Sequence, residues 1–141
     1  MFGFAVAALL AVGPALAAPK KGGTKKPATK KTITVTLKGS NEAPTKGPAK
    51  GTGTAKITLD SKTGKVCFKL TYSHIDTVTA SHIHKGGAGH AGPIVVAFFT
   101  SSAAAKKNGC VTGSKSTVAA IIKKPSAYYA NIHTTKYPGG A

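Results

Sequence analysis

The feature that most constrains the fold of this chain is a period-two alternation of apolar and polar residues. Ile33, Val35 and Leu37 alternate with threonine and lysine, which is typical of a strand with one buried face. The segments 52–59 and 65–73 repeat the pattern on either side of a polar turn, which indicates a β-hairpin. The chain is therefore expected to form sheets.

Three further segments, 80–84, 93–100 and 128–134, have the composition of strands. The segment 116–124 begins with serine and threonine and ends before a proline, so it predicts one short helix. Many short strands separated by turn signals predict an all-β fold, an antiparallel Greek-key sandwich or barrel.

The chain is strongly basic. It has 20 lysines, no arginine and three acidic residues, for a net charge of +17. Three scattered acids provide neither the carboxylate pair of a glycosidase nor an oxygen cage for calcium or magnesium. The length of 141 residues leaves room for one domain, which we place at residues 32–141.

Residues 1–17 combine an apolar stretch with small residues at its end, which predicts a signal peptide. The stretch is short for a bilayer span, so we expect no transmembrane segment in the mature chain. An uncleaved membrane anchor is the alternative. Export would place the protein in a secreted, periplasmic or cell-surface location.

Residues 18–31 are rich in lysine, glycine and proline and lack large apolar side chains, so we expect a disordered tail. Its lysines are candidates for binding an anionic surface polymer: Lys20, Lys21, Lys25, Lys26, Lys30 and Lys31. A plain spacer is the equal alternative. Since the tail has no aromatic residue for base stacking, we expect no sequence-specific binding of nucleic acid.

The chain has two cysteines, Cys67 and Cys110. An even number in an exported chain favours one disulfide bond, and two buried free thiols are the alternative.

The histidines are the most informative polar residues. His82 and His84 are two positions apart in an expected strand, so their side chains point to the same face and can chelate one metal ion. His133, in another expected strand, would complete a three-nitrogen site suited to copper or zinc. His90, in a glycine-rich loop, is a possible fourth ligand or a solvent-facing residue.

Other interpretations of the aromatic and histidine residues remain open. The three strand histidines could instead brace loops through hydrogen bonds to the backbone, without any metal. His74 is expected in a turn at the surface. Tyr128 and Tyr129 are expected to serve packing, since adjacent strand residues face opposite sides.

Several segments together resemble the chordin-type (CHRD) domain family. The matching segments, which span roughly residues 33–141, are 37–44, 51–55, the turn at 60–64 with 66–68, 80–84, 92–96, 109–110, 125–134 and 137–141. The resemblance implies an extracellular superoxide-dismutase-like or immunoglobulin-like β-sandwich in which Cys67 pairs with Cys110.

The CHRD pattern is in turn similar to copper/zinc superoxide dismutase. That similarity implies copper ligands at His82, His84 and His133, with His90 in the place of a loop histidine. The chain has no aspartate in the loop after His84 for a zinc site and no arginine to guide superoxide, so a full copper/zinc pair is not expected.

Three functions follow as hypotheses. The first is an exported module that binds one copper or zinc ion for metal storage, sequestration or tolerance. The second is a non-enzymatic extracellular interaction module without metal, docked to an anionic envelope or matrix by its tail. The third is an enzyme, a copper-only dismutase-like catalyst whose lysines steer the superoxide anion.

Overall fold

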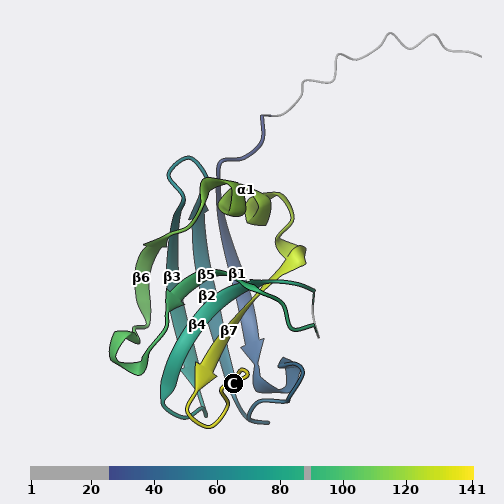
Figure 1. The fold of residues 1–141 in the computed structure, drawn as a ribbon, viewed down its shortest axis with the longest axis vertical. Helices are drawn as coiled ribbons and strands as arrows, with labels where there is room; N and C mark the ends of the chain where they lie inside the picture. Colours follow the sequence, from purple (N-terminus) through teal and green to yellow (C-terminus); the bar gives the residue numbers. More distant parts are fainter. Residues whose placement is uncertain (1–25, 88–89) are drawn as a thin grey trace, which may run out of the picture.

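The computed structural model describes residues 26–87 and 90–141. These residues form two antiparallel sheets packed as a sandwich (Figure 1). Sheet A has the strand order β1 (Lys30–Lys38), β2 (Thr52–Asp60), β3 (Lys65–Ser73), β6 (Asn108–Thr112). Sheet B has the order β5 (Ile94–Phe99), β4 (Val78–Lys85), β7 (Tyr128–Thr134). The fold class expected from the sequence is confirmed.

The connections between the sheets follow a Greek-key path. Strand β3 pairs with β6, while the intervening β4 and β5 pair with each other in sheet B. Helix α1 (Lys115–Lys123) then leads to β7, which joins the free side of β4. Three short 3-10 helices complete the elements: Gly39–Asn41, Ser102–Ala104 and Pro125–Ala127.

The core lies between the two sheets, where the apolar members of each alternating strand are buried. Phe68 of β3 stacks on Phe98 of β5 with ring centroids 4.4 Å apart, which ties sheet A to sheet B. Ile83 and Ile132 contribute to the same core from β4 and β7. The neighbouring residues on those strands therefore face away from sheet A, and this outer face of sheet B carries the site described below.

Helix α1 covers one end of the sandwich (Figure 1). The Ser114 side chain caps it by accepting a hydrogen bond from the Thr117 amide. Val118, Ile121 and Ile122 on its inner face are buried in the core. The expected helix at 116–124 is thus present, one residue earlier along the chain.

Two features differ from the expectation. Strand β6 was not predicted, because its five residues include a glycine and show no run of large apolar side chains. Strand β1 begins at Lys30, so the last two residues of the expected tail are part of the sheet. Lys30 forms an ion pair with Asp60 at 3.5 Å, and the Lys31 ammonium donates to the Ile122 carbonyl at 3.3 Å.

The expected signal peptide at 1–17 and the tail lysines Lys20, Lys21 and Lys25 lie outside the described residues. Within the described part of the chain, no helix is long and apolar enough to cross a membrane.

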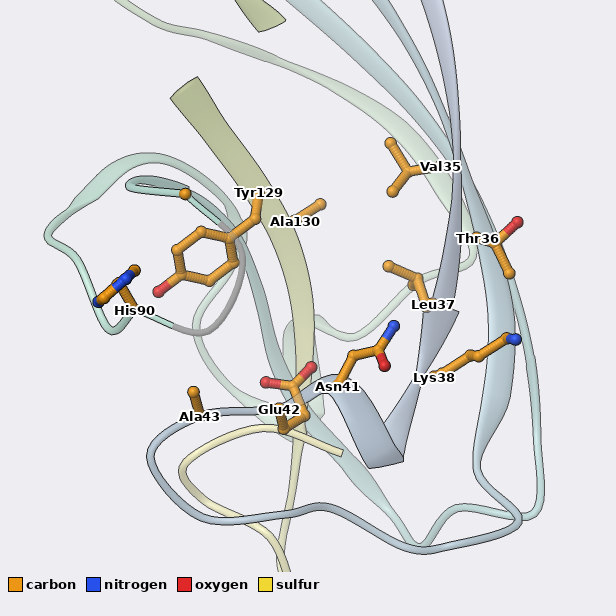
Figure 2. A pocket seen from close by; sticks show the side chains of 11 residues that line it. Val35, Thr36, Leu37, Lys38, Asn41, Glu42, Ala43, His90, Tyr129 and Ala130 are labelled. Carbon is orange, nitrogen blue, oxygen red and sulfur yellow. The ribbon is translucent and has the colours of Figure 1, made fainter. Parts of the chain in front are cut away.

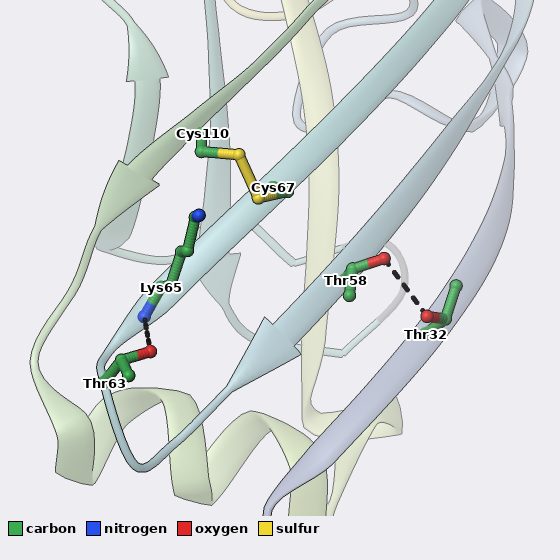
Figure 3. The surroundings of a disulfide bond; sticks show 6 residues. All are labelled: Thr32, Thr58, Thr63, Lys65, Cys67 and Cys110. Carbon is green, nitrogen blue, oxygen red and sulfur yellow. Dashed lines mark hydrogen bonds between the residues drawn. A yellow bond between two sulfur atoms is a disulfide. The ribbon is translucent and has the colours of Figure 1, made fainter.

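The two cysteines form the expected disulfide bond. Cys67 and Cys110 are directly opposite each other on β3 and β6, on the outer face of sheet A (Figure 3). The bond therefore joins the last strand of sheet A to its neighbour.

Candidate metal centre

The pairing of β4 with β7 brings three histidines together. His82 and His84 lie on the outer face of sheet B, while Ile83 between them points into the core. The register places His133 opposite Ala80, so its imidazole lies beside that of His82. One ligand nitrogen from each of the three rings falls within 4.8 Å of the others. The described residues contain no other such cluster.

Two of the imidazoles are held by backbone carbonyls. The Nδ1 of His84 lies 2.7 Å from the Gly92 carbonyl oxygen, and the Nδ1 of His133 lies 2.8 Å from the Pro138 carbonyl oxygen. Because a carbonyl oxygen only accepts, each neutral ring must carry its proton on Nδ1. The Nε2 of both rings then carries a lone pair instead of a proton, the form in which imidazole binds a metal.

The two remaining nitrogens of interest, Nδ1 of His82 and Nε2 of His84, have different surroundings. The Nδ1 of His82 lies 3.1 Å from the Nε2 of His133 and donates to it, since that Nε2 can only accept. The Nε2 of His84 is buried and has no hydrogen-bond partner among the described residues. A buried lone pair without a partner is unfavourable, so the residues present fit a metal ion at this position.

The electrostatics keep the cluster uncharged. Burial, together with the neighbouring His133 and His84, lowers the pKa of His82 to about 4. Burial also lowers the pKa of His133, although its hydrogen bond to Pro138 acts in the opposite direction. Both rings are therefore neutral at neutral pH, as a metal ligand must be.

Tyr129 supports the cluster from β7. Its ring stacks on His84 with an interplanar angle of 8° and a centroid distance of 4.9 Å. Its hydroxyl accepts a hydrogen bond from the Gly92 amide at 3.1 Å, and the carbonyl of the same glycine accepts from His84. Sequence reasoning gave Tyr129 only a packing role. The sequence contained one indication of this second role, because Tyr129 lies on the same strand face as Asn131 and His133.

His90 is exposed and is not one of the imidazoles that the structure brings together. It lines a pocket of about 200 Å³ with Tyr129 and Glu42 (Figure 2). His74 is exposed as well, in the left-handed backbone region with a φ of 57°.

Glu42 and Asn131 form a polar pair next to the histidines. Asn131 lies opposite His82 in the sheet, is 3% exposed, and hydrogen-bonds through its side chain to Glu42. Burial raises the pKa of Glu42 to about 7, although the Asn131 hydrogen bond acts in the opposite direction. Gly140, with a φ of 139°, lies so close that a β-carbon there would overlap the Glu42 carboxylate.

Sequence reasoning missed the Glu42 and Asn131 pair. One signal was present, because Glu42 is one of only three acids in the chain and falls within a segment that carries the family resemblance. The contact itself joins a loop to a strand far away in the sequence, which no local pattern reveals.

Comparisons with known proteins give one match. No curated protein and no solved structure matches the chain significantly. The family model of the CHRD domain matches residues 33–141, which cover both sheets, the disulfide bond and the three clustered histidines. The chain therefore belongs to the CHRD domain family.

Proposed function

We propose that this chain is an exported CHRD-domain protein that binds a single copper ion, with zinc as the alternative, for metal storage, sequestration or tolerance. The ligands are Nδ1 of His82, Nε2 of His84 and Nε2 of His133. Three neutral imidazoles suit both metals. Copper is the first choice because copper(II) binds nitrogen ligands more tightly than zinc does.

The observation that carries the proposal is the Nε2 of His84, which is buried and has no hydrogen-bond partner among the described residues, in a ring that belongs to the three-histidine cluster. The hydrogen bonds from His84 and His133 to backbone carbonyls support it, because metal-binding histidines usually donate their second ring N–H in this way. Metal binding requires His82 to give up the proton on Nδ1, which its neutral ring can carry on Nε2 instead.

Export is supported by two features. The disulfide bond between Cys67 and Cys110 would persist in an oxidising compartment and is rare in a reducing one. The apolar segment at 1–17 has the composition of a signal peptide.

The test is a copper titration of residues 18–141, followed by electron paramagnetic resonance. We expect one equivalent of Cu(II) with a nitrogen-rich spectrum in the parent and in His74→Ala, whose histidine is exposed. The triple variant His82→Ala/His84→Ala/His133→Ala should lose this spectrum. Equal binding by the triple variant would overturn the proposal, because the copper would then be held by groups outside the three-histidine cluster. A parallel zinc titration with calorimetry decides between the two metals.

A further inference from the structure

The outer face of sheet A, opposite the histidines, is made mostly of threonine and lysine and also carries the Cys67–Cys110 disulfide bond. On β1 its residues include Thr32, Thr34 and Thr36, all exposed. On β2 the exposed positions include Thr54 and Thr58. Among the described residues, no aromatic or aliphatic side chain lies on this face. We call it the Thr/Lys face.

The threonines of this face are aligned across the strands. The hydroxyls of Thr32 and Thr58 lie 3.1 Å apart (Figure 3), and those of Thr54 and Thr71 lie 2.6 Å apart. β-branched side chains have few rotamers, and neighbouring strands keep a fixed spacing. The hydroxyls are thus ordered before any ligand arrives, so binding to them loses little conformational entropy.

The lysines of the Thr/Lys face are poorly neutralised. Lys56 and Lys69 are directly opposite each other on β2 and β3, an arrangement that is unfavourable for like charges. Asp60, the single acid among the described positions of this face, is paired with Lys30. Lys38 at the other end of β1 is exposed and has no ion pair with a described residue. The face therefore has an uncompensated positive charge.

We propose that the Thr/Lys face is a docking surface for a linear acidic polysaccharide. Charge complementarity selects a polyanion, and the ordered hydroxyls select a partner that is rich in hydroxyl groups. Nucleic acid is disfavoured because the face has no aromatic side chain for base stacking and no arginine for bidentate phosphate contacts. A lipid surface is disfavoured because the face has no aromatic or aliphatic side chain to insert.

The docking surface and the histidine cluster lie on the outer faces of different sheets. A polysaccharide on sheet A would not cover the histidine cluster on sheet B, so both ligands can bind at once. The proposal is therefore independent of the metal site.

The test measures binding of the full chain to immobilised polygalacturonate at low salt. The key variant is Lys56→Gln/Lys69→Gln, and the matched control is Lys115→Gln/Lys123→Gln, which removes two exposed charges from helix α1. Both variants keep the N-terminal lysines. We expect the face variant to lose about tenfold in affinity and the helix variant to lose much less. Equal losses in the two variants would show attraction by net charge alone and overturn the proposal.

Two further arms distinguish the partners. Thr32→Val/Thr54→Val removes one hydroxyl from each ordered pair and keeps the shape and charge of the face, so it should weaken polygalacturonate binding several-fold without changing its salt dependence. Unchanged binding would overturn the role of the hydroxyls. The same assay is run with poly(dT) and with phosphatidylglycerol vesicles. If either binds more tightly than polygalacturonate and is equally sensitive to Lys56→Gln/Lys69→Gln, the partner is a nucleic acid or a lipid surface, and the polysaccharide proposal is overturned.

Discussion

The Nε2 of His133 lies 3.1 Å from the Nδ1 of His82, across two neighbouring strands of sheet B. Two imidazoles at this distance hold a single proton between them, on the Nδ1 of His82, because a proton on the Nε2 of His133 as well would leave two N–H groups facing each other with no acceptor. The contact therefore requires the His133 ring to be neutral. It also determines how the stability of the metal-free protein depends on pH.

We predict that acid destabilises the metal-free protein through His82. Its pKa falls from 6.5 in the unfolded chain to about 4 in the folded one, so the unfolded state holds more protons between these values. The stabilising contribution is complete above pH 6.5 and is lost as the pH falls to about 4, a change on the order of 3 kcal/mol.

Urea unfolding across this pH range measures the effect. The variant His82→Gln should show a shallower loss of stability in acid, whereas His74→Gln, at an exposed histidine, should behave like the parent. A His82→Gln curve parallel to that of the parent would contradict the prediction.

A second prediction concerns His84 and metal. Copper should raise the free energy of unfolding of the parent, by about 2.7 kcal/mol when free copper is about 100 times its Kd. In His84→Gln this gain should disappear, because the unpartnered Nε2 is removed. Thermal unfolding with copper and with excess chelator provides the comparison. If the histidines only braced loops, the variant would lose the same stability in both conditions.

A third prediction separates the two contacts of Tyr129. Tyr129→Phe removes the hydrogen bond from the Gly92 amide and should lower the free energy of unfolding by about 1 kcal/mol. It keeps the stacked ring, so copper affinity should change little. Tyr129→Leu also removes the stacking on His84 and should weaken copper binding. Calorimetry compares the copper affinity of the two variants. Equal copper affinities would argue against a supporting role for the Tyr129 ring.

A fourth prediction concerns the disulfide bond, which closes a loop with a sequence separation of 43 residues. The double variant Cys67→Ala/Cys110→Ala should lose about 4 kcal/mol of stability, since the unfolded chain gains the freedom of that loop. Copper affinity of the folded variant should not change, because the cysteines belong to sheet A and the histidines to sheet B. A large loss of copper affinity would show that the two sheets are coupled.

Local patterns in the sequence were sufficient to predict most strands and one part of the site. Alternation located β2 and β3 closely, because each buries one face against the core. The spacing of His82 and His84 placed both imidazoles on one strand face, since side chains repeat every second residue. Neither inference required knowledge of distant parts of the chain.

The remaining features depend on contacts between distant segments. The pairing of β4 with β7, which brings His133 to His82, joins residues about 50 positions apart. The carbonyls of Gly92 and Pro138 that hold the rings lie in loops, where backbone groups leave no mark in the residue pattern. Strand β6 is stabilised by its pairing with β3 and by the disulfide bond rather than by its own composition.

A fifth prediction concerns Glu42, whose pH effect is opposite in sign to that of His82. Its pKa rises from 4.5 to about 7 on folding, so the folded state holds more protons between these values. The stabilising contribution is therefore complete below pH 4.5 and is lost as the pH rises through about 7.

Glu42→Gln cannot ionise and keeps a side chain that can hydrogen-bond Asn131. It should match the parent near pH 4.5 and exceed its free energy of unfolding at pH 8. Asp76→Asn, at an exposed acid, is the control. If Glu42→Gln is less stable than the parent at pH 8, the folded chain stabilises the ionised carboxylate and the prediction is wrong.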